Sequence, residues 1–260
     1  MACEFDGKKY EKASIFQQEW GNKLISELNL KGDEDVLDLG CGNGLLTVNL
    51  ARLVPNGNVI GVDASEGMIE VAKEKEEEEN NIKFLLMDLN EIDLSSQFDF
   101  IFSNAALHWI KNHKRLWTNI RKILKPNGFV RFNFAADGNC SHFFKVIKEV
   151  IVFEEYRKYF TGFQWPWYTP SLDEYENILK DFAFSELNVW EENADRFFPD
   201  REAVIKWVDQ PNIVPFLENV PKDKKELFGE IVIEQMIKET LQENGRCFET
   251  FRRINVLAKK

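Results

Sequence analysis

The 260-residue chain has few of the residues that mark metal, disulfide or membrane proteins. It holds three histidines and four cysteines, and no two cysteines form a C-x-x-C pair. The wide spacing of Cys3, Cys41, Cys140 and Cys247 is typical of reduced thiols and predicts neither a disulfide framework nor a metal site. No segment approaches the roughly 20 apolar residues of a membrane span, and the first residues lack the apolar core of a signal peptide. These features predict a cytoplasmic protein that makes no membrane contact.

Basic charge is also scarce. The chain has 33 basic and 44 acidic side chains, which gives a net charge of -11. Proteins that bind nucleic acid or an anionic membrane surface need a basic patch, so neither partner is expected. The acidic run at 73–80, "KEKEEEEN", is interpreted as a solvated helix end.

Short β-rich runs alternate with helical stretches in the first half of the chain. The predicted strands are 35–40, 58–64, 82–89, 98–105 and 129–136, and helices are predicted at 44–53, 66–79 and 113–124. Such alternation indicates an α/β fold with a parallel sheet, helices on both faces, and a ligand site at the carboxyl ends of the strands. Later segments are predicted as a helix at 141–160, a loop at 161–170, a helix at 171–181, a strand at 186–197, helical structure at 200–244 and a strand at 251–260. The "KPNG" at 125–128 predicts a turn before the fifth strand.

A glycine-rich loop follows the first predicted strand, in "DVLDLGCGNG". Gly40, Gly42 and Gly44 permit positive φ and a close approach of the backbone to a ligand, and a helix follows them. Both dinucleotides and adenosyl compounds suit such a loop. The third glycine of a dinucleotide motif would fall at Leu45, however, and Asp63 at the end of the second strand could accept hydrogen bonds from ribose hydroxyls.

Asp38 lies inside the first predicted strand, close to the ligand edge. A carboxylate there is costly unless it is paired, either by a ligand ammonium group or by the N–H groups of the loop. A dehydrogenase cofactor offers no such cation, so Asp38 favours an adenosyl ligand with an amino-acid part.

Five ordered motifs now carry a family resemblance. "VLDLGCGNG", "VIGVDAS", "LMDLNEI", "FDFIFSNAALHWI" and "ILKPNGFV", over about residues 30–136, resemble the class I S-adenosylmethionine-dependent methyltransferases. The resemblance implies a Rossmann-like, doubly wound, seven-stranded sheet whose last strand runs antiparallel beside the sixth. It also implies an N-terminal helical lid at 1–29, a cofactor-binding core at 30–137, and a remainder at 138–260 with lid insertions at 138–184 and 199–247.

The resemblance assigns individual residues to S-adenosylmethionine. The expected cofactor contacts are Tyr10 folding over the ligand, Asp38, Gly40, Cys41 and Gly42 at the methionine part, Asp63 at the ribose, Ala64 and Met68 at the adenine face, Asp88 and Leu89 at the adenine amino group, and Asn104 and Ala105 at the methionyl end. His108 and Trp109 are the expected catalytic residues, beside the methyl group. Each assignment has an alternative. The glycines could serve only a tight turn, and the polar residues could serve only as caps. Tyr10, Met68, His108 and Trp109 could serve only in packing.

A narrower resemblance concerns the substrate. "YTPSLDEYENILKDFAF" and "LQENGRCFETFRRINVLAKK" resemble the trans-aconitate methyltransferases, whereas "FDGKKYEKASIFQQEWGNKLI" resembles the malonyl-carrier-protein methyltransferases of biotin synthesis. Both groups esterify carboxylates, which implies a small carboxylic acid as substrate. A carrier-bound acyl group is the alternative, and the acidic surface argues against it because acyl carrier proteins are themselves acidic.

A carboxylate is already a nucleophile, so its methylation needs placement and exclusion of water more than a general base. Trp165, Trp167 and Tyr168 on the 161–170 loop are the expected aromatic contacts to the substrate. The candidate cations, which would bind a carboxylate through forked donors, are Arg196, Arg201, Arg246, Arg252 and Arg253. Arg201 and Arg246 are selected from these five, with a solvated surface charge as the alternative for each.

Two other function classes remain open at this point. A nicotinamide or flavin oxidoreductase is disfavoured by the G-x-G-x-G spacing and by Asp88, and a catalytically silent ligand-binding protein would keep the fold alone. The chain is expected to be a monomer or a weak dimer.

Overall fold

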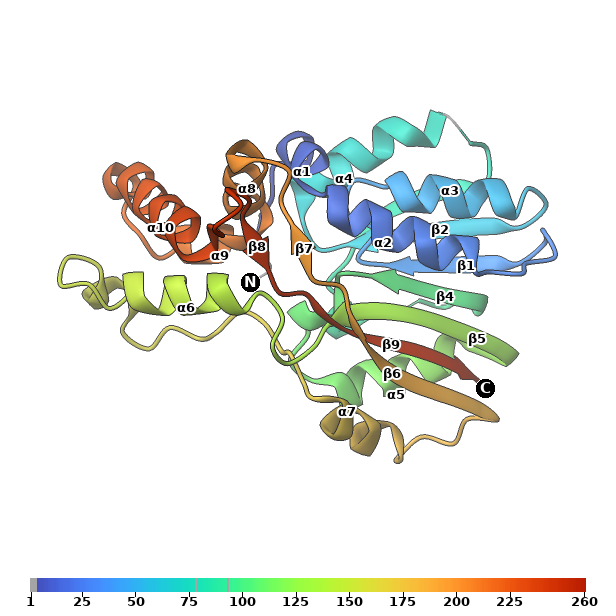
Figure 1. Cartoon of the computed structure of the whole chain (residues 1–260). Helices are drawn as coiled ribbons and strands as arrows, with labels where there is room; N and C mark the ends of the chain where they lie inside the picture. Colours follow the sequence, from blue (N-terminus) through green and yellow to red (C-terminus); the bar gives the residue numbers. More distant parts are fainter. Residues whose placement is uncertain (1–3, 78, 93) are drawn as a thin grey trace.

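A seven-stranded sheet forms the centre of the molecule. The computed structural model describes residues 4–77, 79–92 and 94–260, so Cys3 lies outside the described part. The order of the strands is β3-β2-β1-β4-β5-β9-β6. Their bounds are β1 (Asp35–Leu39), β2 (Asn58–Asp63), β3 (Ile82–Leu86), β4 (Phe98–Asn104), β5 (Leu124–Ala135), β6 (Glu186–Asn193) and β9 (Arg252–Lys259). β1 to β5 are parallel, and β9 runs antiparallel between β5 and β6 (Figure 1). The predicted doubly wound sheet with an antiparallel last strand is confirmed.

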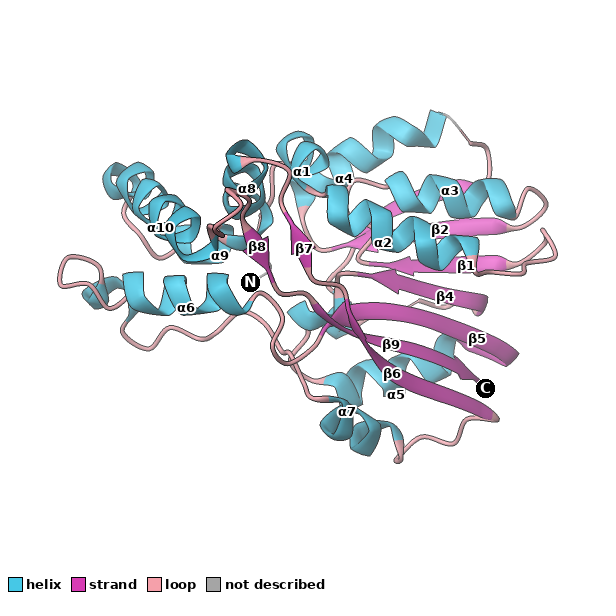
Figure 2. Cartoon of the chain, viewed as in Figure 1, coloured by secondary structure: helices cyan, strands magenta, loops and turns pink. Residues whose placement is uncertain are grey.

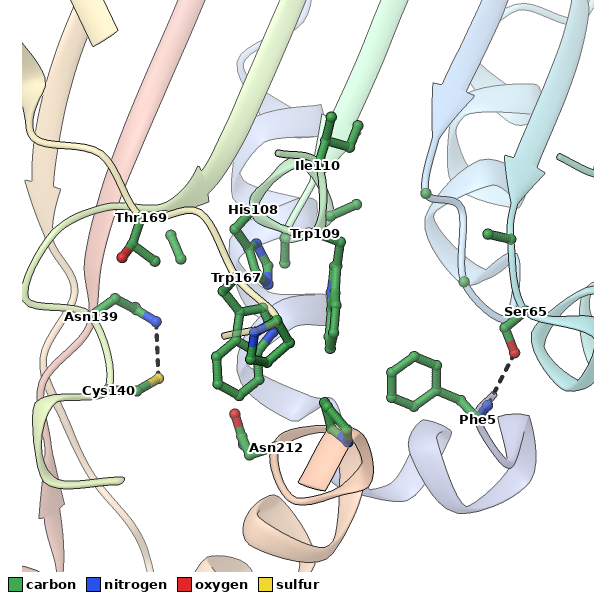
Figure 3. Close-up of a pocket in the computed structure, with 18 of the residues that line it drawn as sticks. Phe5, Ser65, His108, Trp109, Ile110, Asn139, Cys140, Trp167, Thr169 and Asn212 are labelled. Carbon is green, nitrogen blue, oxygen red and sulfur yellow. Dashed lines mark hydrogen bonds between the residues drawn. The ribbon is translucent and has the colours of Figure 1, made fainter. Parts of the chain in front are cut away.

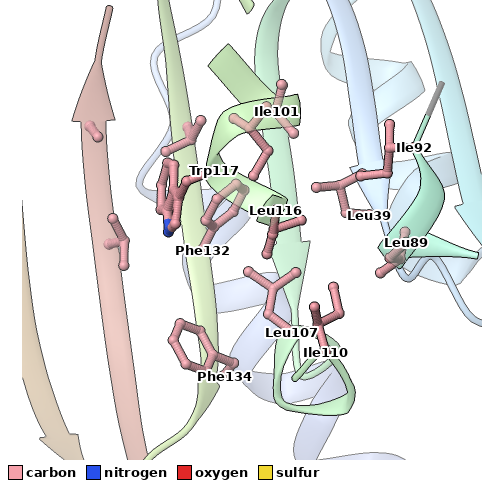
Figure 4. Close-up of a cluster of buried hydrophobic side chains, with 14 of the residues drawn as sticks. Leu39, Leu89, Ile92, Ile101, Leu107, Ile110, Leu116, Trp117, Phe132 and Phe134 are labelled. Carbon is pink, nitrogen blue, oxygen red and sulfur yellow. The ribbon is translucent and has the colours of Figure 1, made fainter. Parts of the chain in front are cut away.

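The middle strands are buried on both faces, as the apolar runs in the sequence require. Val36, Leu37 and Leu39 of β1 have no exposed surface, which is typical of a parallel strand covered by helices on each side. One face carries α2 (Ile15–Ser26), α3 (Leu45–Leu53) and α4 (Glu66–Lys73), and the other carries α5 (His113–Ile123) and α7 (Leu172–Leu179) (Figure 2). Trp117 of α5 packs on Phe132 of β5, with Leu116 and Ile101 in the same core (Figure 4).

Four helices form a separate lobe beyond the carboxyl ends of the parallel strands (Figure 1). This helical lobe consists of α6 (Ser141–Val150), α8 (Arg201–Trp207), α9 (Val214–Leu217) and α10 (Lys225–Thr240). It has an aromatic core of its own, which includes Phe143, Trp207 and Phe216. A two-stranded sheet of β7 (Arg196–Phe197) and β8 (Phe248–Glu249) and the short N-terminal helix α1 (Gly7–Ala13) complete the elements near it.

Element boundaries differ from the prediction mainly outside the first four strands. The strand expected at 186–197 ends at Asn193, because the chain bends at Asp195, whose N–H donates to the Asn193 side chain, and 196–197 pair with β8 instead. The helix expected at 141–160 ends at Val150, and the stretch at 200–244 is broken into three α-helices with a short π-helix and a 3-10 helix between them. β5 already begins at Leu124, so the "KPNG" turn is an irregularity at the start of that strand, with Asn127 at φ +64°.

None of the helices in the described part of the chain has the length and apolarity needed to cross a membrane.

Candidate active site

A cavity of about 590 Å³ opens where the sheet meets the helical lobe. Residues at the carboxyl ends of β1 and β4 line it together, including Gly40 and Asn104. β1 lies between β2 and β4, so the chain reverses its winding direction here, which is where open α/β sheets bind ligands. The volume is typical of a small-molecule site. We call this space the central cavity.

The loop after β1 is shaped by two glycines that line the cavity. Gly40 has φ +73°, and a Cβ there would lie 2.1 Å from the Cβ of Ala106, so only glycine permits this close approach of two strand ends. Gly42 has φ +55°, and a Cβ there would meet no atom within 4 Å. The loop therefore leaves open space against bare backbone, which fits a ligand seated on it.

Asp63, at the end of β2, joins the neighbouring loops. One carboxylate oxygen accepts a hydrogen bond from the Gly42 N–H at 2.9 Å, and the other accepts from the Ser65 N–H at 3.0 Å. Burial raises the pKa of Asp63 even though these N–H groups act against that shift. Ala64 and Met68 follow on the same wall of the cavity.

Asp38 and Cys41 do not line the cavity. Asp38 is buried and accepts a hydrogen bond from the Thr47 hydroxyl at 2.7 Å. Burial raises the pKa of Asp38 to about 7. The expected pairing with loop N–H groups is therefore corrected: the first turn of α3 supplies the partner. Cys41 is also buried, and burial raises the pKa of its thiol.

The other residues expected at the cofactor reach the central cavity. They are Tyr10, Asp88, Leu89, Asn104 and Ala105. Asp88 accepts hydrogen bonds from the backbone and side-chain nitrogens of Asn90, each at 2.8 Å. The Asn104 side-chain amide donates to the Gln17 carbonyl oxygen at 2.8 Å, which ties β4 to helix α2.

His108 and Trp109 lie on the short 3-10 helix Leu107–Trp109 that follows β4. Burial lowers the pKa of His108 well below its usual range, so the imidazole is neutral. The Trp109 ring meets Phe5 edge-on at 5.7 Å between centroids and Trp167 at 5.5 Å, forming an aromatic row across the cavity (Figure 3).

Several buried polar atoms of the cavity wall have no hydrogen-bond partner among the described residues. They are Gln17 Oε1, Trp20 Nε1, Asn104 Oδ1, His108 Nδ1 and Asn139 Oδ1. Buried polar groups are nearly always satisfied, and leaving one without a partner costs free energy. Five such atoms around one cavity fit a polar ligand that completes them.

Of the aromatic residues expected to contact substrate, only Trp167 lines the cavity. Trp165 packs outside it against Phe144, at 5.0 Å between ring centroids, and the Tyr168 hydroxyl donates to Glu174 at 2.7 Å. Residues 161–170 form what we call the aromatic loop. Residues two apart would share one side of a regular extended segment, but the chain bends at Pro166, and of the two tryptophans only Trp167 lines the cavity.

The two selected arginines also lie away from the cavity. Arg201 is exposed at the start of α8, and the Arg246 guanidinium lies 4.8 Å from the centroid of the Phe197 ring. Nothing in the positions of Arg201 and Arg246 supports the predicted contact with substrate.

Arg253 of β9 is the arginine that lines the cavity. It is 3 % exposed, its Nε donates to Asn133 Oδ1 at 2.8 Å, and its guanidinium lies 4.6 Å from the Trp20 ring. Burial lowers the pKa of Arg253 to about 10, so it stays charged at neutral pH. Among the residues that the structure describes, no carboxylate forms an ion pair with it, and the charge of Glu192, which pairs with Lys23, acts on its pKa from a longer distance.

Sequence reasoning placed Arg253 among five candidates but did not select it, and it missed Phe5, Trp20, Asn139 and Trp207, which also line the cavity. The register that sets Arg253 opposite Ala135 is a property of the antiparallel pairing. The sequence gives no signal that separates Arg253 from its neighbour Arg252.

Comparisons with known proteins bear on the chemistry of this site. A family model described as "Methyltransferase domain" matches residues 36–128. An uncharacterized methyltransferase of Schizosaccharomyces pombe is 28% identical and covers 98% of each chain. A trans-aconitate 2-methyltransferase of Escherichia coli K12 is 27% identical over 92% of this chain and 91% of its own.

Solved structures agree on the fold. The YcgJ protein of Bacillus subtilis superposes with a TM-score of 0.63 at 16% identity, over 94% of this chain and 98% of its own. A Haemonchus contortus phosphoethanolamine N-methyltransferase 2 in complex with S-adenosyl-L-methionine gives 0.62 at 21% identity, over 98% of this chain and 56% of its own.

The glycine loop, the strand order and these relatives therefore all indicate a methyltransferase. The open space over Gly42 and the unsatisfied polar atoms of the cavity wall fit S-adenosylmethionine. Residues 36–128 match a methyltransferase domain, and the chain is an S-adenosylmethionine-dependent methyltransferase with the class I fold.

Proposed function

We propose that this enzyme methylates a carboxylate oxygen of a small organic acid and releases a neutral methyl ester. The name of the trans-aconitate 2-methyltransferases supports an acid as acceptor. The observation that carries the proposal is Arg253, a buried guanidinium in the cavity wall with no carboxylate partner among the described residues. A buried charge is costly when unpaired, and the planar fork of arginine matches a carboxylate.

Methylation of a carboxylate requires no proton transfer by the protein. S-adenosylmethionine, when bound, supplies an electrophilic methyl group. A lone pair of the carboxylate oxygen forms the new C–O bond, the S–C bond breaks, and its electron pair stays on sulfur, so no proton moves. The neutral His108 and the ring of Trp109 then serve to orient the acceptor and exclude water.

We assign the residues along the cavity to two ligands. S-adenosylmethionine would contact Tyr10, Gly40, Gly42, Asp63, Ala64, Met68, Asp88, Leu89, Asn104 and Ala105. Asp38 and Cys41 would support the loop from behind. The acid would lie between Arg253 and Trp167, with His108 and Trp109 at the junction.

Segments outside the core at 30–137 contribute residues to the cavity wall. Phe5, Tyr10 and Trp20 come from the first 29 residues, and Trp167 and Trp207 come from the insertions at 138–184 and 199–247. We therefore propose that these segments act as a lid over the core at 30–137.

Arg253→Gln tests the proposal. Charge-assisted hydrogen bonds contribute about 1.5–3 kcal/mol, so kcat/KM for the acid should fall roughly 10- to 150-fold while the Kd for S-adenosylmethionine changes less than threefold. Arg253→Lys should recover part of the loss. The matched control is Arg115→Gln, since Arg115 is exposed on α5, outside the cavity.

Two results would contradict the proposal. One is methylation of a neutral amide analogue as fast as the free acid. The other is an Arg253→Gln enzyme that binds S-adenosylmethionine poorly but has an unchanged KM for the acid. That result would mean that Arg253 binds the methionine carboxylate of the cofactor.

A further inference from the structure

The charges of the central cavity limit how many carboxylates the acceptor carries. The lining residues with ionic side chains are Asp63, Asp88, Glu218 and Arg253. Asp63 is the last residue of β2 and Asp88 follows β3, on the side proposed for the adenosyl group. The rest of the cavity, which we call the acceptor half, is lined by the helical lobe, the aromatic loop and β9. There Arg253 is the cation and Glu218 is an acid.

A tricarboxylate such as trans-aconitate would bring three negative charges to this acceptor half. Burying a charged group without a partner is strongly unfavourable. The nearby Lys111 does not line the cavity, and its ammonium group already donates to the carbonyl oxygens of Trp165 and Trp167 at 2.6 and 2.7 Å. Among the described residues, Arg253 can therefore pair one carboxylate, and the second and third would face neutral side chains or Glu218.

Aromatic rings form one part of the remaining wall, beside amide side chains such as those of Asn139, Asn212 and Asn219. Trp167 stacks on Phe144 with 5.3 Å between ring centroids and an interplanar angle of 8°, and both line the cavity. Opposite elements contribute Trp207 and Phe251, whose rings meet edge-on at 5.7 Å. Because these rings hold one another in place, they form a fixed apolar surface. Such a surface favours an apolar body by about 25 cal/mol for each Å² removed from water.

We infer that the acceptor is a monocarboxylic acid with an apolar aliphatic or aromatic body, and not a tricarboxylate. This inference rests on the proposed carboxylate methylation and narrows its substrate. The single carboxylate pairs with Arg253, and the body lies against Trp167, Phe144, Trp207 and Phe251.

Competition between acids tests the inference. The enzyme with saturating S-adenosylmethionine is given trans-aconitate together with straight-chain acids from hexanoate to decanoate, phenylacetate and cinnamate, and the methyl esters are quantified by mass spectrometry. At least one monocarboxylate should exceed trans-aconitate tenfold or more in kcat/KM. The same acids are titrated into the complex with S-adenosylhomocysteine by calorimetry, and the order of affinities should agree.

Variants of Trp167 test whether the aromatic side chains of the acceptor half cause the preference for a monocarboxylate. Trp167→Ala should lower kcat/KM for the preferred monocarboxylate at least tenfold and change the value for trans-aconitate less than threefold. Trp167→Leu, which keeps more of the packing, should give a smaller loss and guards against a folding defect. Phe153→Ala is the matched control, because Phe153 is exposed outside the cavity. This variant should leave the ratio of kcat/KM for the monocarboxylate to kcat/KM for trans-aconitate unchanged.

The outcomes separate the two proposals. If no monocarboxylate surpasses trans-aconitate in rate or in affinity, the inference is overturned. If trans-aconitate is esterified fastest, carboxylate methylation still stands. If no acid is methylated while an amine acceptor in the same assay is, both proposals fail.

Discussion

Asp63 shows how one side chain can serve both the fold and the ligand. Its two oxygens accept hydrogen bonds from the N–H groups of Gly42 and Ser65, and the residue also lines the central cavity. Each carboxylate oxygen has more than one acceptor position, so these bonds leave capacity for ribose hydroxyls. The same carboxylate thus holds the glycine loop and is available to the cofactor.

Replacing Asp63 by asparagine should weaken cofactor binding. The amide puts an NH₂ group where a carboxylate oxygen accepted, and the charge is lost, so we expect a loss of about 1–3 kcal/mol in binding free energy for S-adenosylmethionine. Calorimetry measures it, with the exposed Asp33→Asn as the control. An unchanged affinity in Asp63→Asn would remove the residue from the cofactor site.

At the scale of elements, the aromatic loop is fastened to the core by a small number of bonds. Lys111, just after the 3-10 helix that carries His108 and Trp109, donates to two carbonyl oxygens of this loop. The Tyr168 N–H donates to the His108 carbonyl oxygen at 2.7 Å. The position of Trp167 in the cavity wall therefore depends on Lys111, a positioning residue that does not touch the proposed ligands.

Lys111→Met should loosen the aromatic loop and leave the cofactor half intact. With two hydrogen bonds lost, at about 0.5–1.5 kcal/mol each, we expect KM for the acceptor to rise at least fivefold and the Kd for S-adenosylmethionine to change less than twofold. Lys114→Met, which removes an exposed ion pair with Asp181, is the control. Equal losses for both ligands would show that the loop supports the whole cavity.

Prediction from sequence succeeded where local pattern determines position. Parallel strands end at one edge, so Gly40, Asp63, Asp88 and Asn104 could be placed together from the strand ends alone. The antiparallel strand between β5 and β6 followed from the family resemblance. The assignment of ligand contacts to these residues remains a prediction.

The sequence did not predict which side chains of the insertions line the cavity. Trp165 and Trp167 are two residues apart and equally aromatic, and packing against Phe144 and the lobe decides which lines the cavity. Arg253 was indistinguishable from Arg201 and Arg246 because its place comes from the register of β9 with β5. Long-range packing of this kind leaves no local signal.

At the scale of the whole molecule, one buried acid links global stability to pH. Asp38 lies in β1, an inner strand of the sheet, and burial raises its pKa in the folded state to about 7, above the value of about 3.9 in an unfolded chain. The folded protein thus binds more protons at this site between these pH values. The contribution to stability is present at low pH and is lost as pH rises toward 7.

Asp38→Asn isolates that contribution, since asparagine can still accept the Thr47 hydrogen bond. We expect the free energy of unfolding of the parent protein, relative to the variant, to decrease between about pH 4 and pH 7 and to level off above. Urea unfolding at several pH values measures the difference. A difference that does not vary with pH would mean that Asp38 is ionised throughout.

The position of β9 between β5 and β6 also affects the order in which parts of the molecule fold. β9 pairs with both β5 and β6, so residues 136–251 must be closed into a loop before β9 pairs with β5, and residues 194–251 before it pairs with β6. Loop closure over such a separation costs entropy before any contact repays it, and pairings of this kind are slow. Because Arg253 belongs to β9, we expect the cation proposed to bind the acceptor to enter the cavity late in folding. A chain that stalls before that step would hold the glycine loop and the cofactor half but have no means of selecting an acid.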